Sequence, residues 1–186
     1  MIGSYEFNAD AIVLSQAAFS EADVLLDLYV DGLGRILASS RGVKHLKSKL
    51  RYQLEPYSII KATLIETKSN GWRLINADLY RNLYYELDGR NQQVLIRLFD
   101  LFYRVLPPQE IIVVVESFIN QVRAGEYDLI NNYLYTASDL LIELGYLSSP
   151  KRQEIVSSEL RQESLTDKQV SYLQRLIVDS LANSQL

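Results

Sequence analysis

Apolar and polar residues alternate along much of the first 80 residues, which is the pattern of half-buried β-strands. The clearest case is Val24–Val30, where apolar residues occupy every second position. Shorter apolar runs at Ala11–Leu14 and Arg35–Ser39 are flanked by turn-forming residues, and Gly32 and Gly34 bracket the connection between the last two runs. The pattern predicts three strands, of which the second and third form a hairpin.

Two more strands are predicted before the pattern changes. Tyr57–Thr67 is long and rich in β-branched residues, and Trp72–Ala77 follows it after the sequence Ser69-Asn70-Gly71. Asn-Gly is a strong turn signal because both residues tolerate positive φ. Five short strands within residues 1–80 predict a small closed β-barrel of the oligonucleotide-binding (OB) type.

After Tyr80 the apolar spacing becomes helical. Apolar residues between Val94 and Val105 follow an amphipathic stripe, and Pro107-Pro108 is expected to end that helix. The segment 111–122 contains a strand-like IIVVV run, but its apolar residues also fit one helical face, so we predict a helix there. The clearest stripe lies in residues 129–144 and precedes Gly145, which is expected to cap the helix.

A last helix is predicted from a capping box. Thr166 is followed three residues later by Gln169, and the apolar stripe continues to Leu181. The predicted fold is therefore α+β, with a five-stranded barrel domain over residues 1–80 and a helical domain over residues 81–186.

Charge is distributed unevenly along the chain. The 186 residues carry a net charge of −4, yet the stretch 34–51 holds six of the 19 Lys and Arg residues and no acid. We expect these six side chains to contact nucleic-acid phosphates, because such binding draws on Lys and Arg and is indifferent to base sequence. The alternative is a solvated loop that only keeps the protein soluble. The six residues are Arg35, Arg41, Lys44, Lys47, Lys49 and Arg51.

Other chemistry finds little support in the sequence. There is no cysteine and only one histidine, His45, so thiolate zinc sites and most catalytic metal sites are excluded. We expect no metal, no cofactor and no enzymatic activity. No apolar run is long enough for a membrane span, and the N-terminus lacks a signal-peptide pattern, so we expect a cytoplasmic protein without membrane contact.

The residues quoted so far carry a family resemblance. The first apolar strand, Ser20-Glu21-x-Asp23 before the second, Gly42-Val43-Lys44 in the basic stretch and Leu54-Glu55-Pro56-Tyr57 together resemble the N-terminal domain of RecO, the bacterial recombination mediator. The helical half is similar through "LLIELGYL" at 140–147. It departs from the family pattern afterwards, since residues 147–165 form a cysteine-free linker where a zinc module is expected.

The resemblance implies a DNA repair and recombination mediator associated with the bacterial nucleoid. Such a protein binds single- and double-stranded DNA, anneals complementary strands and helps to load the recombinase. Implied partners are RecR and the C-terminal tail of single-strand-binding protein, which ends in an apolar residue and a free carboxylate. Candidates for the tail site are Arg97, Arg104, Arg123 and Phe102, and second-line DNA contacts are Lys68 and Arg73 beside the Asn-Gly turn.

Two rival functions stay open. A protein–protein adaptor of the same fold could have lost useful DNA binding, which the acidic composition and the missing zinc module favour. An RNA-binding barrel is the other, since the sequence offers nothing that selects DNA over RNA. Exposed aromatic side chains could stack bases in either case, with Trp72, Tyr52 and Tyr57 nearest to the basic stretch.

Overall fold

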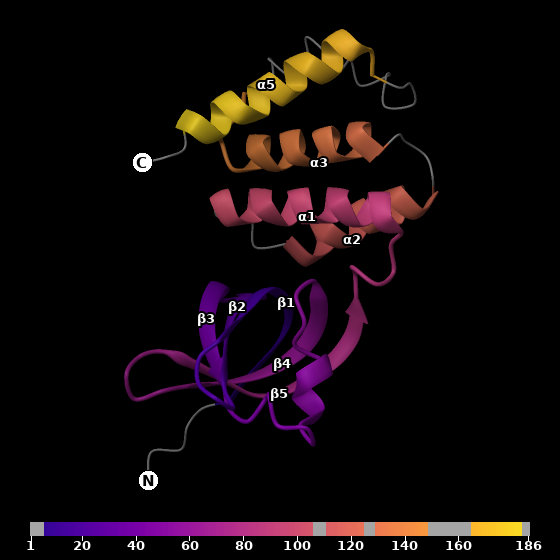
Figure 1. Ribbon diagram of the computed structural model, residues 1–186. Coiled ribbons are helices and arrows are strands. Elements are labelled where there is room, and N and C mark those ends of the chain that lie inside the picture. The colour runs from indigo at the N-terminus through magenta and orange to yellow at the C-terminus, as the bar shows by residue number, and fades with distance from the viewer. Residues whose placement is uncertain (1–5, 106–110, 125–128, 149–164, 184–186) are drawn as a thin grey trace. The chain divides into compact units, whose positions relative to one another are not determined.

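The computed structural model describes residues 6–105, 111–124, 129–148 and 165–183. The chain divides into two compact units, Met1–Leu87 and Asp88–Leu186. Each unit is described by itself. Among the described residues, the first unit contains the five strands and the second contains the α-helices (Figure 1).

The first unit is a five-stranded closed barrel with the strand order β1-β2-β3-β5-β4. Its strands are β1 (Glu6–Ala18), β2 (Val24–Val30), β3 (Gly34–Ser40), β4 (Ser58–Glu66) and β5 (Trp72–Asn82). All neighbouring strands are antiparallel except β3 and β5, which pair in parallel over only three residue pairs. This arrangement confirms the predicted five-stranded OB-type architecture followed by helices.

Strand β1 closes the barrel because it pairs with a different partner at each end. Residues 6–12 pair with β4, and residues 11–18 pair with β2. A bulge between Val13 and Ser15 lets the strand bend from one partner to the other. The predicted run Ala11–Leu14 is its fully buried centre, and the longer strand was missed because its ends are largely polar.

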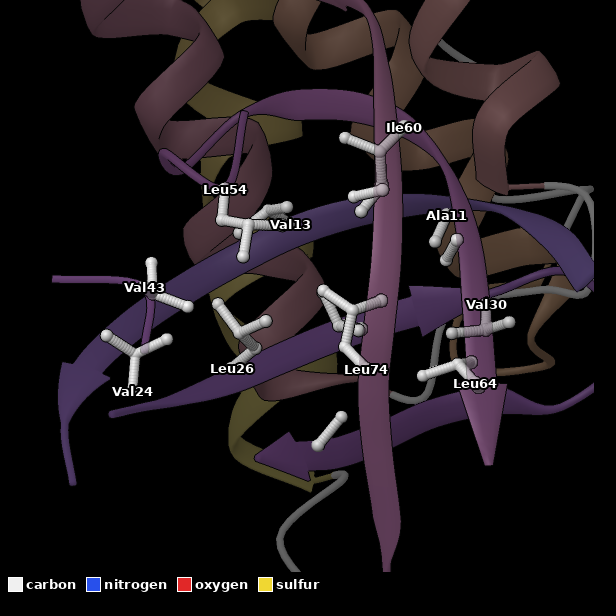
Figure 2. Packing of buried hydrophobic residues seen from close by; sticks show 14 residues of the cluster. Ala11, Val13, Val24, Leu26, Val30, Val43, Leu54, Ile60, Leu64 and Leu74 are labelled. Carbon is white, nitrogen blue, oxygen red and sulfur yellow. The ribbon is translucent and has the colours of Figure 1, made fainter. Parts of the chain in front are cut away.

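The barrel core consists of residues that point inward from all five strands. Figure 2 shows this cluster, in which Leu26, Ile60, Leu64 and Leu74 are at most 2% exposed. Burial of such side chains contributes roughly 1.5–3 kcal/mol each. Alternate residues of β2 and β3 point outward, which is why the period-2 pattern predicted these strands correctly.

The second unit contains four described helices, and all four were predicted. They are α1 (Gly89–Arg104), α2 (Ile111–Ala124), α3 (Leu129–Glu143) and α5 (Asp167–Asn183). The IIVVV segment lies in α2, so the helical reading of its pattern is confirmed. Pro107-Pro108 and most of the expected linker 147–165 lie outside the described residues.

The predicted helix caps are also present. Gly145 adopts φ 77°, and the N–H groups of Gly145 and Tyr146 donate to the carbonyls of Ile142 and Leu141, which is a Schellman motif. At the start of α5, the Thr166 N–H donates to Gln169 Oε1, and the Gln169 N–H donates to Thr166 Oγ1. Among the described helices, none has the length and apolarity needed to cross a bilayer.

Candidate nucleic-acid interface

The connection between β3 and β4, residues 41–57, carries most of the predicted phosphate contacts and is firmly anchored. Val43 and Leu54 are 2% and 0% exposed and belong to the core cluster, and Leu50 packs against it. Figure 2 shows Val43 and Leu54 among the strand residues of that cluster. A 3₁₀ helix, η1 (Lys49–Tyr52), lies between these anchors. The connection is therefore a structured segment.

These apolar anchors orient the cations. Val43, Leu50 and Leu54 are directed into the barrel, and the basic residues between them are exposed, as is Arg41 just before Val43. We call these five exposed cations the basic segment: Arg41, Lys44, Lys47, Lys49 and Arg51.

The start of the basic segment is tied to the β1–β2 turn. The Gly42 N–H donates to Asp23 Oδ1 at 2.9 Å, and the Lys44 N–H donates to the Ala22 carbonyl at 3.0 Å. Gly42 adopts φ 68°, and a Cβ atom there would lie 3.3 Å from the His45 ring. A glycine is required at this position because other residues are strained in that conformation.

The tie to Asp23 is electrostatic as well as geometric. The hydrogen bond from the Gly42 N–H lowers the pKa of the Asp23 carboxyl, and the Ser20 hydroxyl and the charges of Arg41 and His45 add to this effect. Asp23 therefore stays ionised, although it forms no ion pair with Arg41. The resemblance had marked Ser20 and Asp23 only as family features, and the structure gives both a role in holding the segment.

Arg35 differs from the other predicted contacts. Its Nε and Nη2 donate to Asp27 Oδ1 and Oδ2 at 3.1 and 2.8 Å, and the Asp27 side chain is only 10% exposed. A two-bond pair of this kind holds the guanidinium in place and neutralises its charge. The expectation that all six cations lack local compensation is therefore wrong for Arg35.

The five cations of the basic segment form no ion pair with an acid within the part of the chain that the structure describes. Lys44 Nζ donates to the Ser20 carbonyl at 2.7 Å, which positions the ammonium group without neutralising it. The segment thus presents uncompensated positive charge on the barrel surface. This arrangement suits contacts to phosphate oxygens.

The second-line candidates Lys68 and Arg73 lie together at the β4–β5 turn. Both line a surface cavity of about 510 Å³ along with Thr67 and Ser69. Arg73 Nε is buried and has no hydrogen-bond acceptor among the described residues. The parallel β3–β5 register places Arg73 opposite Ser39, two residues before Arg41.

Of the three aromatic residues considered for base stacking, only Tyr52 is largely exposed. Trp72 packs against the core and lies 6.2 Å from the Phe7 ring centroid. Tyr57 is stacked on Tyr84 with a centroid separation of 5.7 Å. Tyr52 is 68% exposed, and its ring contacts the basic segment through Arg51.

The candidates for partner binding in the helical unit differ in how far their side chains are buried. Phe102 is 0% exposed and packs against Phe99, so it stabilises the core of this unit and is not carried forward as a surface contact. Arg97 and Arg104 are exposed on α1. The side chain of Arg123 lies outside the described residues.

The charges of Arg97 and Arg104 both affect the pKa of the Tyr133 hydroxyl of α3. Burial raises the pKa of the Tyr133 hydroxyl, whereas the charges of Arg97 and Arg104 lower it and Asp100 raises it. The two arginines therefore lie on one side of α1 near a half-buried phenol. Asp100, between them in sequence, offsets part of their charge.

The chain matches the family model described as "Recombination protein O N terminal" over residues 1–80. Residues 1–80 are therefore similar to the RecO family. The match covers all five strands except the last two residues of β5, together with the complete basic segment. The RecO resemblance of the N-terminal domain is thereby confirmed.

Curated relatives carry the same description. The chain is 25% identical to a "DNA repair protein RecO" of Myxococcus xanthus over 64% of its own length and 51% of the relative's. It is 38% identical to a "DNA repair protein RecO" of Streptomyces avermitilis, over 39% of this chain and 28% of the relative. The match thus spans about half the length of the Myxococcus protein and a smaller share of the Streptomyces protein. These descriptions name DNA repair and no catalytic activity.

Two features of the barrel unit were missed from the sequence, although a signal existed for one of them. In the β2–β3 hairpin Asp27 lies opposite Leu37 and diagonal to Arg35, so the hairpin register could have predicted their pairing. The anchoring of the basic segment by Val43 and Leu54 had no such signal. Isolated apolar residues in a connection do not reveal which core they enter.

Proposed function

We propose that this chain is a DNA repair and recombination mediator that binds single- and double-stranded DNA through the basic segment. The observation that carries the proposal is the anchored row of five uncompensated cations on a RecO N-terminal domain. Lys68 and Arg73 would extend the contact along the barrel. The role would place the protein on chromosomal DNA in the cytoplasm.

Annealing follows from the same surface. Cations that neutralise the phosphates of two complementary strands reduce their repulsion while leaving the bases free to pair. No described helix of the barrel unit is long enough to read a major groove, so we expect little sequence selectivity.

The test is fluorescence anisotropy of a labelled single strand at several salt concentrations. Five phosphate contacts predict a slope of log affinity on log salt of about −3.5, at about −0.7 per contact. The double variant Lys47→Glu/Lys49→Glu should bind much more weakly, because both side chains are exposed and make no ion pair. A double variant at Lys61 and Lys168, which lie outside the segment, is the matched control.

The partners are proposed on the same basis. We infer that RecR and the C-terminal tail of single-strand-binding protein bind this chain, with Arg97 and Arg104 pairing with the acidic tail and its terminal carboxylate. A labelled tail peptide should bind the wild type and lose affinity in Arg97→Glu. The matched control is Arg175→Glu, which changes an exposed arginine of α5 and should bind the peptide like the wild type.

The adaptor function has one structural observation in its favour. Phe19 and Leu46 are 63% and 88% exposed, in the β1–β2 turn and in the β3–β4 connection. Exposed apolar side chains of this size suit a protein partner. If the protein is an adaptor, the wild type should bind neither DNA nor RNA at low salt. If it instead binds RNA in preference to DNA of the same sequence, it is the RNA-binding barrel.

A further inference from the structure

The basic segment borders a cavity. Part of the lining of this cavity is not needed for binding phosphates. The cavity measures about 490 Å³, within the roughly 300–1,000 Å³ range of ligand sites. Part of its lining is apolar and comes from Ala17 and Ala18 at the end of β1, Val24 at the start of β2, and Val43. Apolar lining favours a ligand with an apolar surface of its own.

Tyr52 supplies an aromatic surface to this cavity. It is 68% exposed, and the Arg51 guanidinium carbon lies 5.8 Å from its ring centroid. An exposed tyrosine with an adjacent arginine is a stacking platform for a nucleobase, since every base has a π-face and arginine adds a cation–π contribution.

The polar groups that line the cavity favour a base over a phosphate as its ligand. Gln16 contributes an amide, and Glu55 contributes a carboxylate that accepts a hydrogen bond from the Tyr85 hydroxyl at 2.9 Å. An amide and a carboxylate match the donors and acceptors on the edge of a base. The carboxylate would repel a phosphate, which belongs instead on Lys44 and Arg51.

We propose that this cavity takes one unpaired base of a single strand, stacked on Tyr52, while the flanking phosphates lie on Lys44 and Arg51. The inference rests on the proposed function and deepens it, because it names the part of the nucleic acid that the cavity selects. A base inside a duplex is stacked and paired on both sides and cannot enter. The cavity therefore strengthens binding to single strands alone.

The experiment compares three labelled ligands of equal length by fluorescence anisotropy. They are a single strand, the same strand with its bases removed, and a duplex. In Tyr52→Ala we expect affinity for the base-bearing single strand to fall by about 5- to 150-fold, the range for loss of one stacked base. Affinity for the abasic strand and for the duplex should stay at the wild-type level.

Two variants control for structure. Tyr52→Phe keeps the ring and should bind all three ligands like the wild type. Tyr80→Ala removes a tyrosine of β5 that is 56% exposed and does not line the cavity, and it should also leave all three affinities unchanged.

The possible failures are distinguishable. If Tyr52→Ala weakens binding to all three ligands equally, Tyr52 supports the segment and the base site is overturned. If Tyr52→Ala changes nothing while Lys47→Glu/Lys49→Glu weakens binding, the base site is again overturned and the proposed function stands. If the wild type binds none of the ligands at low salt, both proposals fail.

Discussion

At the scale of single residues, the charge available to a ligand depends on the nearest acid. Arg35 and Lys47 are the two extremes in this chain, since Arg35 is paired with Asp27 and Lys47 is exposed without an acidic partner in the described residues. The same formal charge therefore has a structural role in one case and a binding role in the other.

This contrast gives a paired prediction. Arg35→Gln should lower the free energy of unfolding by about 1–3 kcal/mol, because Asp27 is left largely buried with its charge uncompensated. Lys47→Gln should change stability by less than about 0.5 kcal/mol but reduce the salt slope of DNA binding by about 0.7. Urea unfolding and anisotropy measure the two effects. The reverse pattern would mean that Arg35, not Lys47, contacts phosphate.

Asp23 predicts a dependence on pH. Its folded pKa lies below the ordinary value of 3.8, so its hydrogen bond to Gly42 stabilises the fold fully above that value and is lost as pH falls through the folded pKa. Wild type should be more stable than Asp23→Asn at about pH 6, and the difference should shrink toward about pH 3. Urea unfolding across this range checks it, and a difference independent of pH would contradict it.

The sequence could reveal the cations at this scale but not their partners. A run of Lys and Arg is visible directly, whereas the hydrogen bond from Gly42 to Asp23 joins residues 19 positions apart. Such a contact depends on how two turns meet in space. The pattern of one segment contains no information about that.

At the scale of elements, the sequence predicted strands best where apolar residues recur at every second position and enter the barrel core. β2 was found with its correct bounds, and β4 to within one residue at each end. β5 runs five residues beyond Ala77, because the bulges opposite β4 interrupt its alternation. The helix η1 was missed, because it is a single short turn without a periodic pattern; its Leu50 packs against the core, and the buried Leu54 follows it.

This dependence on burial is testable with two equally buried leucines. Leu54→Ala and Leu26→Ala should each cost about 2–5 kcal/mol of stability, since both side chains are 0% exposed. Only Leu54→Ala should also weaken DNA binding under conditions where both variants are folded, because Leu54 anchors the basic segment and Leu26 lies in β2. Circular dichroism establishes folding, and anisotropy measures affinity. Equal losses of affinity would show that the segment does not depend on its anchor.

At the scale of the whole molecule, the two units differ in charge. Residues 1–87 contain ten Lys or Arg and ten Asp or Glu, whereas residues 88–186 contain nine and thirteen. The entire net charge of −4 therefore resides in the helical unit. An acidic unit repels the DNA that the neutral barrel attracts through its basic segment.

A fragment of residues 1–87 should therefore bind single-stranded DNA at least as tightly as the whole chain, with the same salt slope. The fragment contains all five strands, the basic segment and a complete core, so it should fold alone. Anisotropy at matched salt concentrations makes the comparison. Much weaker binding by a folded fragment would show that the helical unit contributes contacts of its own.

The sequence also predicted the order of the two architectures, because the apolar period changes from two to 3.6 residues after Tyr80. It could not predict that β3 pairs with β5. That pairing joins segments more than 30 residues apart, with no hairpin turn to indicate it.

The short β3–β5 pairing has a consequence for motion. Three residue pairs close this seam, against seven to nine pairs for each other neighbour, so it should open most readily by local unfolding. Amide protons of Trp72 to Leu74 that point to β3 should then exchange with solvent before those between β1 and β4. The basic segment leaves β3 at this same seam, so transient opening would let the cations spread apart and follow a strand whose phosphates do not match the closed surface.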